Sequence, residues 1–261
     1  WIGSGKDVER RAVEEAGLEF FRIPSGKLRR SLSPRNIVDA FKVVAGYIAA
    51  HRLLRTLKPR VLFSKGGYVS VPPCRAAKAL GIPVFAHESD VTPGLATRMV
   101  IASATRVFTS YERTRNFLPA STAGKVTVVG NPVRRAVLEG NAARGRSFLG
   151  APPATLIVLF VGGSQGARQV NDIVAESLSK IAPLAFVVHQ YGEGLSPAEP
   201  ADAAISGRYR AYPFIRSEMP DVIAASDIVV GRAGAGTVWE SAALGKPMVL
   251  IPLCGSGTRG D

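Results

Sequence analysis

Short apolar runs rich in Val, Ile and Phe alternate with longer segments of helical period along the whole chain. The short runs predict strands at Phe20–Ile23, Val61–Ser64, Val84–His87, Arg106–Thr109, Val126–Val129, Leu156–Phe160, Phe186–His189, Tyr209–Ala211, Ile228–Val230 and Met248–Ile251. The segments between them predict helices at Asp7–Ala16, Pro34–Leu57, Val71–Leu80, Gly94–Ala102, Tyr111–Phe117, Ala167–Ile181, Met219–Ala225 and Thr237–Leu244. Strands without polar alternation are buried on both faces, so we expect an α/β fold of parallel, doubly wound sheets covered by helices.

One stretch interrupts this alternation. Residues Arg134–Pro153 are mostly small or polar and end in Pro152-Pro153 before the next apolar run. We interpret the stretch as a linker and place the domain boundary near its start, which gives domains 1–134 and 135–261. Two Rossmann-like domains joined in this way are expected to face a cleft, where ligands usually bind.

The charge of the chain is unevenly distributed. The 261 residues carry a formal net charge of +13, and 46% of them are hydrophobic, which excludes intrinsic disorder. Residues 1–134 hold 22 Lys and Arg against 9 Asp and Glu, whereas residues 135–261 hold 11 of each. The first domain is therefore expected to face an anionic partner, which composition alone leaves open between nucleic acid, a membrane surface and an acidic ligand. No apolar run reaches the roughly 18 residues of a spanning helix.

Metal chemistry is not indicated by the sequence. Cys74 and Cys254 stand alone, and His51, His87 and His189 are far apart, without the spacing of a metal site. No DxD motif is present, so we expect no cofactor and no divalent ion to be required. Two unpatterned cysteines suit a reducing cytosol.

A glycine-rich loop follows the predicted strand Leu156–Phe160 and precedes a helix. It reads Gly162-Gly163-Ser164-Gln165-Gly166-Ala167-Arg168. Glycines allow close approach of the backbone, and a helix N-terminus presents unpaired N–H groups to an anion, so the loop is a candidate phosphate site. The alternative is a tight turn in which glycine only permits close packing.

A second loop of this kind, Gly231–Thr237, follows the strand Ile228–Val230. Its expected helix carries Glu240 in the first turn, where a carboxylate can accept hydrogen bonds from vicinal hydroxyls such as a ribose diol. The alternative is an acid that only stabilises the helix dipole. Two such loops and a diol acceptor together predict a nucleotide-diphosphate site.

The first domain has polar groups at the expected carboxyl ends of its strands, where open parallel sheets bind ligands. Gly66, Gly67 and Tyr68 follow one strand, and the run from His87 to Asp90 follows the next. Gly130-Asn131-Pro132-Val133-Arg134 closes the domain, so Arg134 is placed to stack on a base or pair with phosphate.

Five motifs stand in order along the chain: Gly66-Gly67-Tyr68-Val69-Ser70, Gly130–Arg134, Gly162–Arg168, Tyr212-Pro213-Phe214-Ile215 and Ala233–Glu240. Together with Ser25–Arg30 and His87–Gly94 they resemble the MurG family of peptidoglycan glycosyltransferases. Members of that family move N-acetylglucosamine from UDP-N-acetylglucosamine onto undecaprenyl-linked lipid I, which makes lipid II. The resemblance covers essentially the whole chain. It implies the GT-B fold, with the acceptor in the first domain and the UDP-sugar mainly in the second.

The resemblance also implies roles for individual residues. The loop Gly163, Ser164, Gln165 and Gly166 would hold the donor, with Ser164 on its phosphate, and Ile215 would read uracil through its backbone. Arg134 would lie against the nucleotide. Ala235, Gly236 and Thr237 would offer main-chain donors to the diphosphate, and Glu240 would hold the ribose hydroxyls. Gly66, Gly67 and Tyr68 would form the acceptor loop.

Three departures from the family pattern stand out. The N-terminal GTGGHxxP loop with its histidine is absent, and so is the glutamine that follows the last glycine-rich stretch, because the chain stops at Asp261. We therefore expect each domain to lack one end. Asp90 stands where many members carry asparagine, and it is our candidate for the base or for a sugar contact.

The segment Pro34–Leu57 is unusually apolar for a surface helix. One stripe holds Ile37, Phe41, Val44 and Ile48, and a second holds Val43, Tyr47 and Leu54, beside Lys and Arg residues. We expect one stripe to face the sheet, and the other either to face an anionic membrane or to be buried by neighbouring segments. With the family resemblance this implies a peripheral protein on the cytoplasmic face of the bacterial inner membrane, acting in cell wall synthesis and hence in cell shape and division.

Other functions remain open at this level. A GT-B enzyme that glycosylates diacylglycerol, a UDP-sugar epimerase and a fragment that binds UDP-sugar without turnover would share much of this pattern. A nucleic-acid-binding protein fits the basic charge, but no nucleic-acid module is present, so we expect no nucleic-acid partner.

Overall fold

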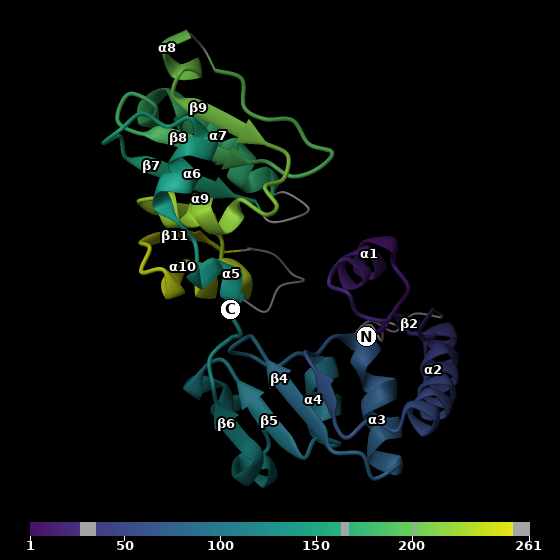
Figure 1. Cartoon of the computed structure of the whole chain (residues 1–261). Coiled ribbons are helices and arrows are strands. Elements are labelled where there is room, and N and C mark those ends of the chain that lie inside the picture. Colours follow the sequence, from purple (N-terminus) through teal and green to yellow (C-terminus); the bar gives the residue numbers. More distant parts are fainter. Residues whose placement is uncertain (27–34, 163–166, 201–202, 253–261) are drawn as a thin grey trace. The chain divides into compact units, whose positions relative to one another are not determined.

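The computed structural model describes residues 1–26, 35–162, 167–200 and 203–252 (Figure 1). The chain divides into two compact units, Trp1–Gly130 and Asn131–Asp261. Each unit is built on a parallel sheet, as predicted for this α/β chain. The boundary between them precedes Arg134, so this residue belongs to the second unit.

The first unit contains a four-stranded parallel sheet in the order β3-β4-β5-β6. Its strands are β3 (Leu62–Ser64), β4 (Val84–Glu88), β5 (Arg106–Thr109) and β6 (Val126–Val128), and a separate parallel pair is formed by β1 (Ile2–Gly3) and β2 (Phe21–Arg22). The helices are α1 (Asp7–Glu15), α2 (Arg35–Leu57), α3 (Val71–Ala79) and α4 (Leu95–Ile101), with 3-10 turns at Tyr68–Ser70, Glu112–Phe117 and Ala120–Lys125. The α-helix predicted at Tyr111–Phe117 is therefore wrong; the segment is a 3-10 helix between two short loops.

Helix α3 is the centre of the first unit's core. It packs against α2 on one side and against the sheet on the other, which leaves Cys74, Ala76 and Ala77 without exposed surface (Figure 1). Small side chains at these positions let the helix lie close to the strands. Burial raises the pKa of the Cys74 thiol to about 11, so this cysteine is a packing residue rather than a nucleophile.

The second unit has a five-stranded parallel sheet in the order β11-β10-β7-β8-β9. Its strands are β7 (Ile157–Val161), β8 (Phe186–Gln190), β9 (Tyr209–Tyr212), β10 (Ile228–Arg232) and β11 (Met248–Ile251). Its helices are α5 (Arg135–Leu138), α6 (Ala142–Leu149), α7 (Arg168–Ile181), α8 (Ala203–Ser206), α9 (Met219–Ala225) and α10 (Ala235–Ala243).

Strand β7 shows why the second sheet reads as a continuous apolar run. Ile157 and Leu159 belong to the core cluster that includes Met219 and Val222 of α9, whereas Phe160 belongs to the cluster that includes Val174 of α7. Successive side chains of a strand point to opposite faces, so both faces of this sheet are buried. The predicted doubly wound architecture is confirmed.

The linker predicted at Arg134–Pro153 is wrong. The stretch forms α5 and α6, and α6 packs closely against α9 within the second unit. Asn141 caps α6 by accepting from the Arg144 backbone N–H at 3.0 Å, and the Arg144 guanidinium pairs with Asp221 of α9 at 2.8 Å. Gly145 lies so close to the backbone of Asp221 that an added Cβ would stand 2.1 Å from its carbonyl oxygen. Small and polar residues here serve close helix packing, not chain flexibility.

Candidate functional site

The carboxyl ends of β3 and β4 form one edge of the first unit's sheet. Gly66 and Gly67, directly after β3, have φ angles of 87° and 83°, a conformation that side chains other than glycine rarely adopt. The Ser70 hydroxyl donates to the Gly67 carbonyl at 2.7 Å and holds the turn. The two glycines of the predicted acceptor loop are thus required by the backbone path.

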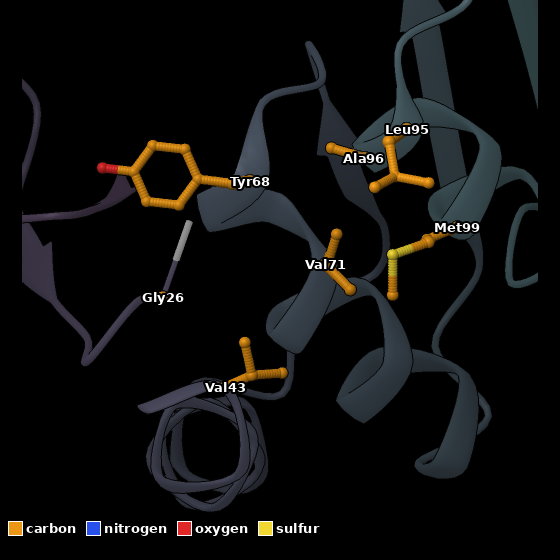
Figure 2. A pocket seen from close by; sticks show the side chains of 7 residues that line it. All are labelled: Gly26, Val43, Tyr68, Val71, Leu95, Ala96 and Met99. Atoms are coloured by element: carbon orange, nitrogen blue, oxygen red, sulfur yellow. The ribbon is translucent and has the colours of Figure 1, made fainter. Parts of the chain in front are cut away.

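Tyr68, the third residue of that loop, lines a small apolar pocket. Figure 2 shows the pocket walls, which come from the segment after β2, from the 3-10 turn at Tyr68–Ser70 and from α2, α3 and α4: Gly26, Val43, Tyr68, Val71, Leu95, Ala96 and Met99. The Tyr68 hydroxyl lies at the end of the ring away from Val71 and Met99 (Figure 2). A cavity of about 40 Å³, as the described residues form it, has room for a methyl group or two and not for a sugar ring.

A chain of polar contacts crosses this edge next to the glycines. The Lys65 Nζ lies 3.1 Å from His87 Nδ1 and donates to the Ser89 hydroxyl at 2.9 Å, while His87 Nε2 lies 2.9 Å from the Gly130 carbonyl. A carbonyl only accepts, so Nε2 carries the proton and Nδ1 accepts from Lys65. The pKa of His87 is lowered, mainly because the side chain is buried. The hydrogen bond to the Gly130 carbonyl raises this pKa, and the positive charge of Lys65 lowers it. His87 is thus a neutral hydrogen-bond acceptor that orients the Lys65 ammonium group.

The predicted base, Asp90, lies at the same edge. Its backbone N–H donates to Glu88 Oε1 at 3.0 Å, and its carbonyl accepts from the Thr114 hydroxyl at 3.3 Å. Glu88 is 6% exposed, and its Oε2 atom has no hydrogen-bond partner within the described part of the chain. The backbone of Asp90 is therefore held by two hydrogen bonds, one of them to the more deeply buried carboxylate of Glu88.

In the second unit the two glycine-rich loops follow neighbouring strands. β7 and β10 are paired in parallel, with Val161 opposite Gly231, so both loops start at the same edge of the sheet. An added Cβ on Gly231 would stand 2.8 Å from the Val161 carbonyl oxygen, which explains this glycine by close strand packing. Residues Gly163, Ser164, Gln165 and Gly166 lie outside the described residues, so their predicted contacts with the donor stay predictions.

The N-terminus of α10 opens at this edge. Gly234 caps the helix without a side chain, and the first helical hydrogen bond runs from the Val238 N–H to the Gly234 carbonyl at 3.0 Å. The N–H groups of Ala235, Gly236 and Thr237 therefore have no partner within the helix and point out of its N-terminus. Donors arranged in this way can bind an anion, and their contact with a diphosphate stays a prediction.

Glu240 lies two residues further into its helix than expected. The helix starts at Ala235 rather than Thr237, which moves Glu240 into its second turn, because the small residues after Gly234 already have helical backbone. The alternative role as a first-turn acid on the helix dipole is excluded by this position. A carboxylate there is held about 7.5 Å along the axis from the first residue of the helix.

Glu240 is paired with Arg134. The Nε and Nη2 atoms of Arg134 donate to Oε1 and Oε2 of Glu240 at 2.8 and 3.1 Å, a bidentate pair between residues 106 positions apart. The hydrogen bond from Arg134 to Glu240 raises the pKa of the guanidinium. Two residues that were predicted to bind the nucleotide, Arg134 and Glu240, are therefore paired with each other in the structure.

Ile215 lies three residues after the end of β9, at the same sheet edge. It is 3% exposed, and its N–H donates to the buried Gln190 Oε1 at 2.9 Å. The predicted reading of a base through this amide therefore requires Gln190 to give up its bond. The backbone carbonyl of Ile215 takes no part in this hydrogen bond.

No role was predicted from the sequence for three charged residues at these edges: Lys65, Glu88 and Arg232. Arg232 ends β10, and its Nη1 donates to Gln169 Oε1 at the start of α7 at 2.5 Å, which holds a cation between the end of β10 and the start of α7. A charged residue directly at the carboxyl end of a buried strand is the signal that would have identified all three. In the described part of the chain, no cluster of three His, Cys, Asp or Glu side chains could hold a metal ion.

Helix α2 carries an apolar outer face. Phe41, Val44 and Ile48 are 73%, 58% and 46% exposed, whereas Leu54 of the second predicted stripe is 2% exposed and belongs to the core. The stripe that contains Phe41 is thus the outer one; the side chain of its fourth member, Ile37, is not described. The helices in the described ranges do not include one long and apolar enough to cross a membrane.

Two family models match the chain. The glycosyltransferase family 28 N-terminal domain matches residues 1–109, and the C-terminal domain of the same family matches residues 157–258. The chain is 48% identical over its whole length to a UDP-N-acetylglucosamine–N-acetylmuramyl-(pentapeptide) pyrophosphoryl-undecaprenol N-acetylglucosamine transferase of Treponema denticola, and covers 71% of that protein. It is 42% identical over its whole length to a protein of the same name from Lachnoclostridium phytofermentans and covers 72% of it.

Solved structures share the fold. MurG of Acinetobacter baumannii superposes with a TM-score of 0.66 at 24% identity, over 97% of this chain and 70% of the other. A UDP-GlcNAc 2-epimerase of Neisseria meningitidis, bound to UDP-GlcNAc, superposes with a TM-score of 0.67 at 15% identity, over 95% of this chain and 72% of the other. With the two parallel α/β units, these likenesses confirm the GT-B fold.

Proposed function

The chain belongs to the MurG family within glycosyltransferase family 28, and on that premise we propose that it transfers N-acetylglucosamine from UDP-N-acetylglucosamine to the muramyl 4-hydroxyl of undecaprenyl-linked lipid I. The observation that carries the proposal is identity of 42–48% over the whole chain to relatives named for this reaction. The epimerase fold neighbour is only 15% identical, so it supports UDP-GlcNAc as a ligand of such a fold and not epimerisation by this chain.

The second unit is the proposed donor site. In this proposal the N–H groups at the start of α10, which have no partner within the helix, bind the diphosphate, Glu240 accepts from the ribose hydroxyls, and the Ile215 backbone reads the base. Arg232 adds a cation at the same edge. Backbone donors and cations stabilise the departing UDP without a metal ion.

The first unit is the proposed acceptor site. In one in-line displacement the acceptor oxygen forms a bond to the sugar C1 while the bond from C1 to the UDP oxygen breaks, which inverts an α-linked donor to a β-glycoside. The hydroxyl proton passes to a carboxylate, for which Asp90 is our candidate. Lys65, oriented by His87, lies beside it and suits an anionic group of the acceptor.

The outer face of α2 is the proposed membrane contact. Phe41, Val44 and Ile48 supply exposed apolar surface, and Lys42, Arg52 and Arg55 stand beside them on the same helix. Each basic side chain near an anionic surface contributes roughly 1 kcal/mol. The protein would then act peripherally on the cytoplasmic face of the bacterial inner membrane, in the synthesis that underlies cell shape and division.

The activity is tested by incubating the chain with labelled UDP-N-acetylglucosamine and a lipid I analogue. We expect label in a lipid II product. Label in diacylglycerol supplied as a competing acceptor indicates the related glycolipid enzyme, and conversion of the donor without acceptor indicates an epimerase. UDP binding without any turnover identifies a non-catalytic UDP-sugar-binding chain.

Membrane contact is tested by flotation with vesicles at low salt. Binding to vesicles with anionic lipid should exceed binding to neutral ones, and Phe41→Ser should lower it about fivefold through lost apolar burial. Leu184→Ser is the matched control, because Leu184 is 76% exposed in the second unit. Flotation that does not depend on lipid charge contradicts the proposed membrane face.

A further inference from the structure

Glu240, the residue proposed to bind the ribose, is already paired with another residue of the chain, Arg134. Each oxygen of Glu240 accepts one N–H from Arg134, at 2.8 and 3.1 Å. The side chain of Glu240 is 18% exposed and that of Arg134 is 58% exposed. Arg134 therefore covers the side from which a ligand in solvent would reach the carboxylate.

A ribose diol and this guanidinium need the same atoms. Two vicinal hydroxyls donate in parallel to the two oxygens of a carboxylate, as the Nε and Nη2 atoms of Arg134 already do. A ligand that offers only the diol must break a charge-assisted pair to gain two neutral hydrogen bonds. The affinity for such a ligand is therefore lowered.

A diphosphate changes that balance. The N–H groups of Ala235, Gly236 and Thr237, which have no partner within the helix, lie on the same helix as Glu240, about 7.5 Å along its axis. A diphosphate bound there brings more negative charge within reach of Arg134 than Glu240 carries. Arginine binds phosphate oxygens in the same forked geometry as a carboxylate, so the guanidinium can exchange one anion for the other.

We propose that Arg134 makes recognition of the ribose conditional on a diphosphate: it closes Glu240 in the empty site and leaves it when a nucleoside diphosphate supplies a stronger anionic partner. Arg134 is then a specificity-determining residue that favours nucleoside diphosphates over nucleosides. The inference rests on the proposed donor site and adds an order of events: the diphosphate binds first, and Glu240 then becomes available to the ribose.

The test compares the affinities of uridine and UDP, measured by calorimetry, for the unchanged chain and for Arg134→Met. The variant should bind uridine about fivefold more tightly, because the competing pair is gone, and UDP at least threefold more weakly, because the diphosphate loses a cation. Opposite shifts are the distinguishing result. Arg134→Gln, which retains a polar side chain, should change the two affinities in the same way as Arg134→Met does: tighter binding of uridine and weaker binding of UDP.

Two further variants serve as controls. Arg135→Met removes the neighbouring guanidinium, which pairs with Glu139 at 2.7 Å, and should leave both affinities unchanged. In a Glu240→Gln background, which has no carboxylate to close, Arg134→Met should no longer tighten uridine binding. If Arg134→Met weakens both ligands, or leaves uridine unchanged, the conditional role is wrong while the donor site stands. If the unchanged chain does not bind UDP, the proposed donor site itself is wrong.

Discussion

Strands β4 and β8 end in the same way, one in each unit. β4 reads Val-Phe-Ala-His-Glu and β8 reads Phe-Val-Val-His-Gln, and in both the last two side chains are buried. In the first unit His87 orients the charged Lys65, and Glu88 keeps one carboxylate oxygen without a partner among the described residues. In the second unit His189 and Gln190 are neutral groups that hold other parts of the same unit.

The difference shows how one sheet edge is adapted to two tasks. The first unit collects ionisable side chains at its edge, as proton transfer and an anionic acceptor require. The second pairs its polar side chains with other groups of the same unit and leaves the first N–H groups of α10 without a partner in their helix, which suits a diphosphate. The excess of positive charge in residues 1–134 follows the same division.

The largest expected effect tests whether His189 is purely structural. Its Nε2 donates to Asn171 Oδ1 at 3.0 Å and its Nδ1 accepts from the Tyr209 hydroxyl at 2.8 Å, without exposed surface. Burial lowers the pKa of His189 from 6.5 to about 4. The unfolded chain therefore binds a proton below pH 6.5 that the folded one does not, and stability falls as the pH falls from 6.5 to 4, by about 3 kcal/mol from this group.

The measurement is urea unfolding at pH 7 and pH 4 of the chain and of His189→Gln. Trp1→Phe as the background leaves Trp239 of α10 to report the second unit. The difference in the free energy of unfolding between the two pH values should be about 3 kcal/mol smaller in His189→Gln, since the carboxylates titrate in both proteins. Equal pH dependence would show that His189 is protonated in the folded unit.

The next effect tests the charged edge of the first unit. Asp90→Asn should lower kcat by about 100-fold, because an amide cannot take the hydroxyl proton, and leave KM for UDP-N-acetylglucosamine within about twofold. Glu112→Gln is the control, an exposed acid of the same unit paired with Arg115 at 2.8 Å. Unchanged turnover removes Asp90 from proton transfer and directs attention to Glu88, which Glu88→Gln tests in the same assay.

Sequence reasoning located the strands because a strand buried on both faces has no polar alternation to obscure it. Ile157 and Phe160 face different core clusters, yet both are apolar. It missed α6 because the reasons for that helix lie elsewhere in the chain: Asp221 pairs with Arg144, and Gly145 fits against the Asp221 backbone. A stretch rich in Ala, Gly and Arg is held as a helix here by those contacts together with the Asn141 cap.

The candidate site divides in the same way. The rule that parallel strands end at one edge correctly placed the strand ends at Gly231 and Val161, from which the two glycine-rich loops start, at the same edge of the sheet. The pairing of Arg134 with Glu240 joins residues 106 positions apart and leaves no local signal. The use of the Ile215 N–H by Gln190 is equally invisible, because it depends on a side chain of a neighbouring strand.

The smallest of these effects tests whether the second unit binds through its backbone. Ala235 is the first residue of α10, where proline is tolerated because its N–H is not used by the helix, and Gly234 before it is already extended, with φ −81° and ψ 144°. Ala235→Pro should keep the helix and lower UDP affinity about tenfold by removing one donor to a charged ligand. Ala235→Ser keeps the donor and should stay within about twofold. Equal affinity in the two variants would show that this N–H does not face the diphosphate, and the donor site would then depend on side chains, as the first unit does.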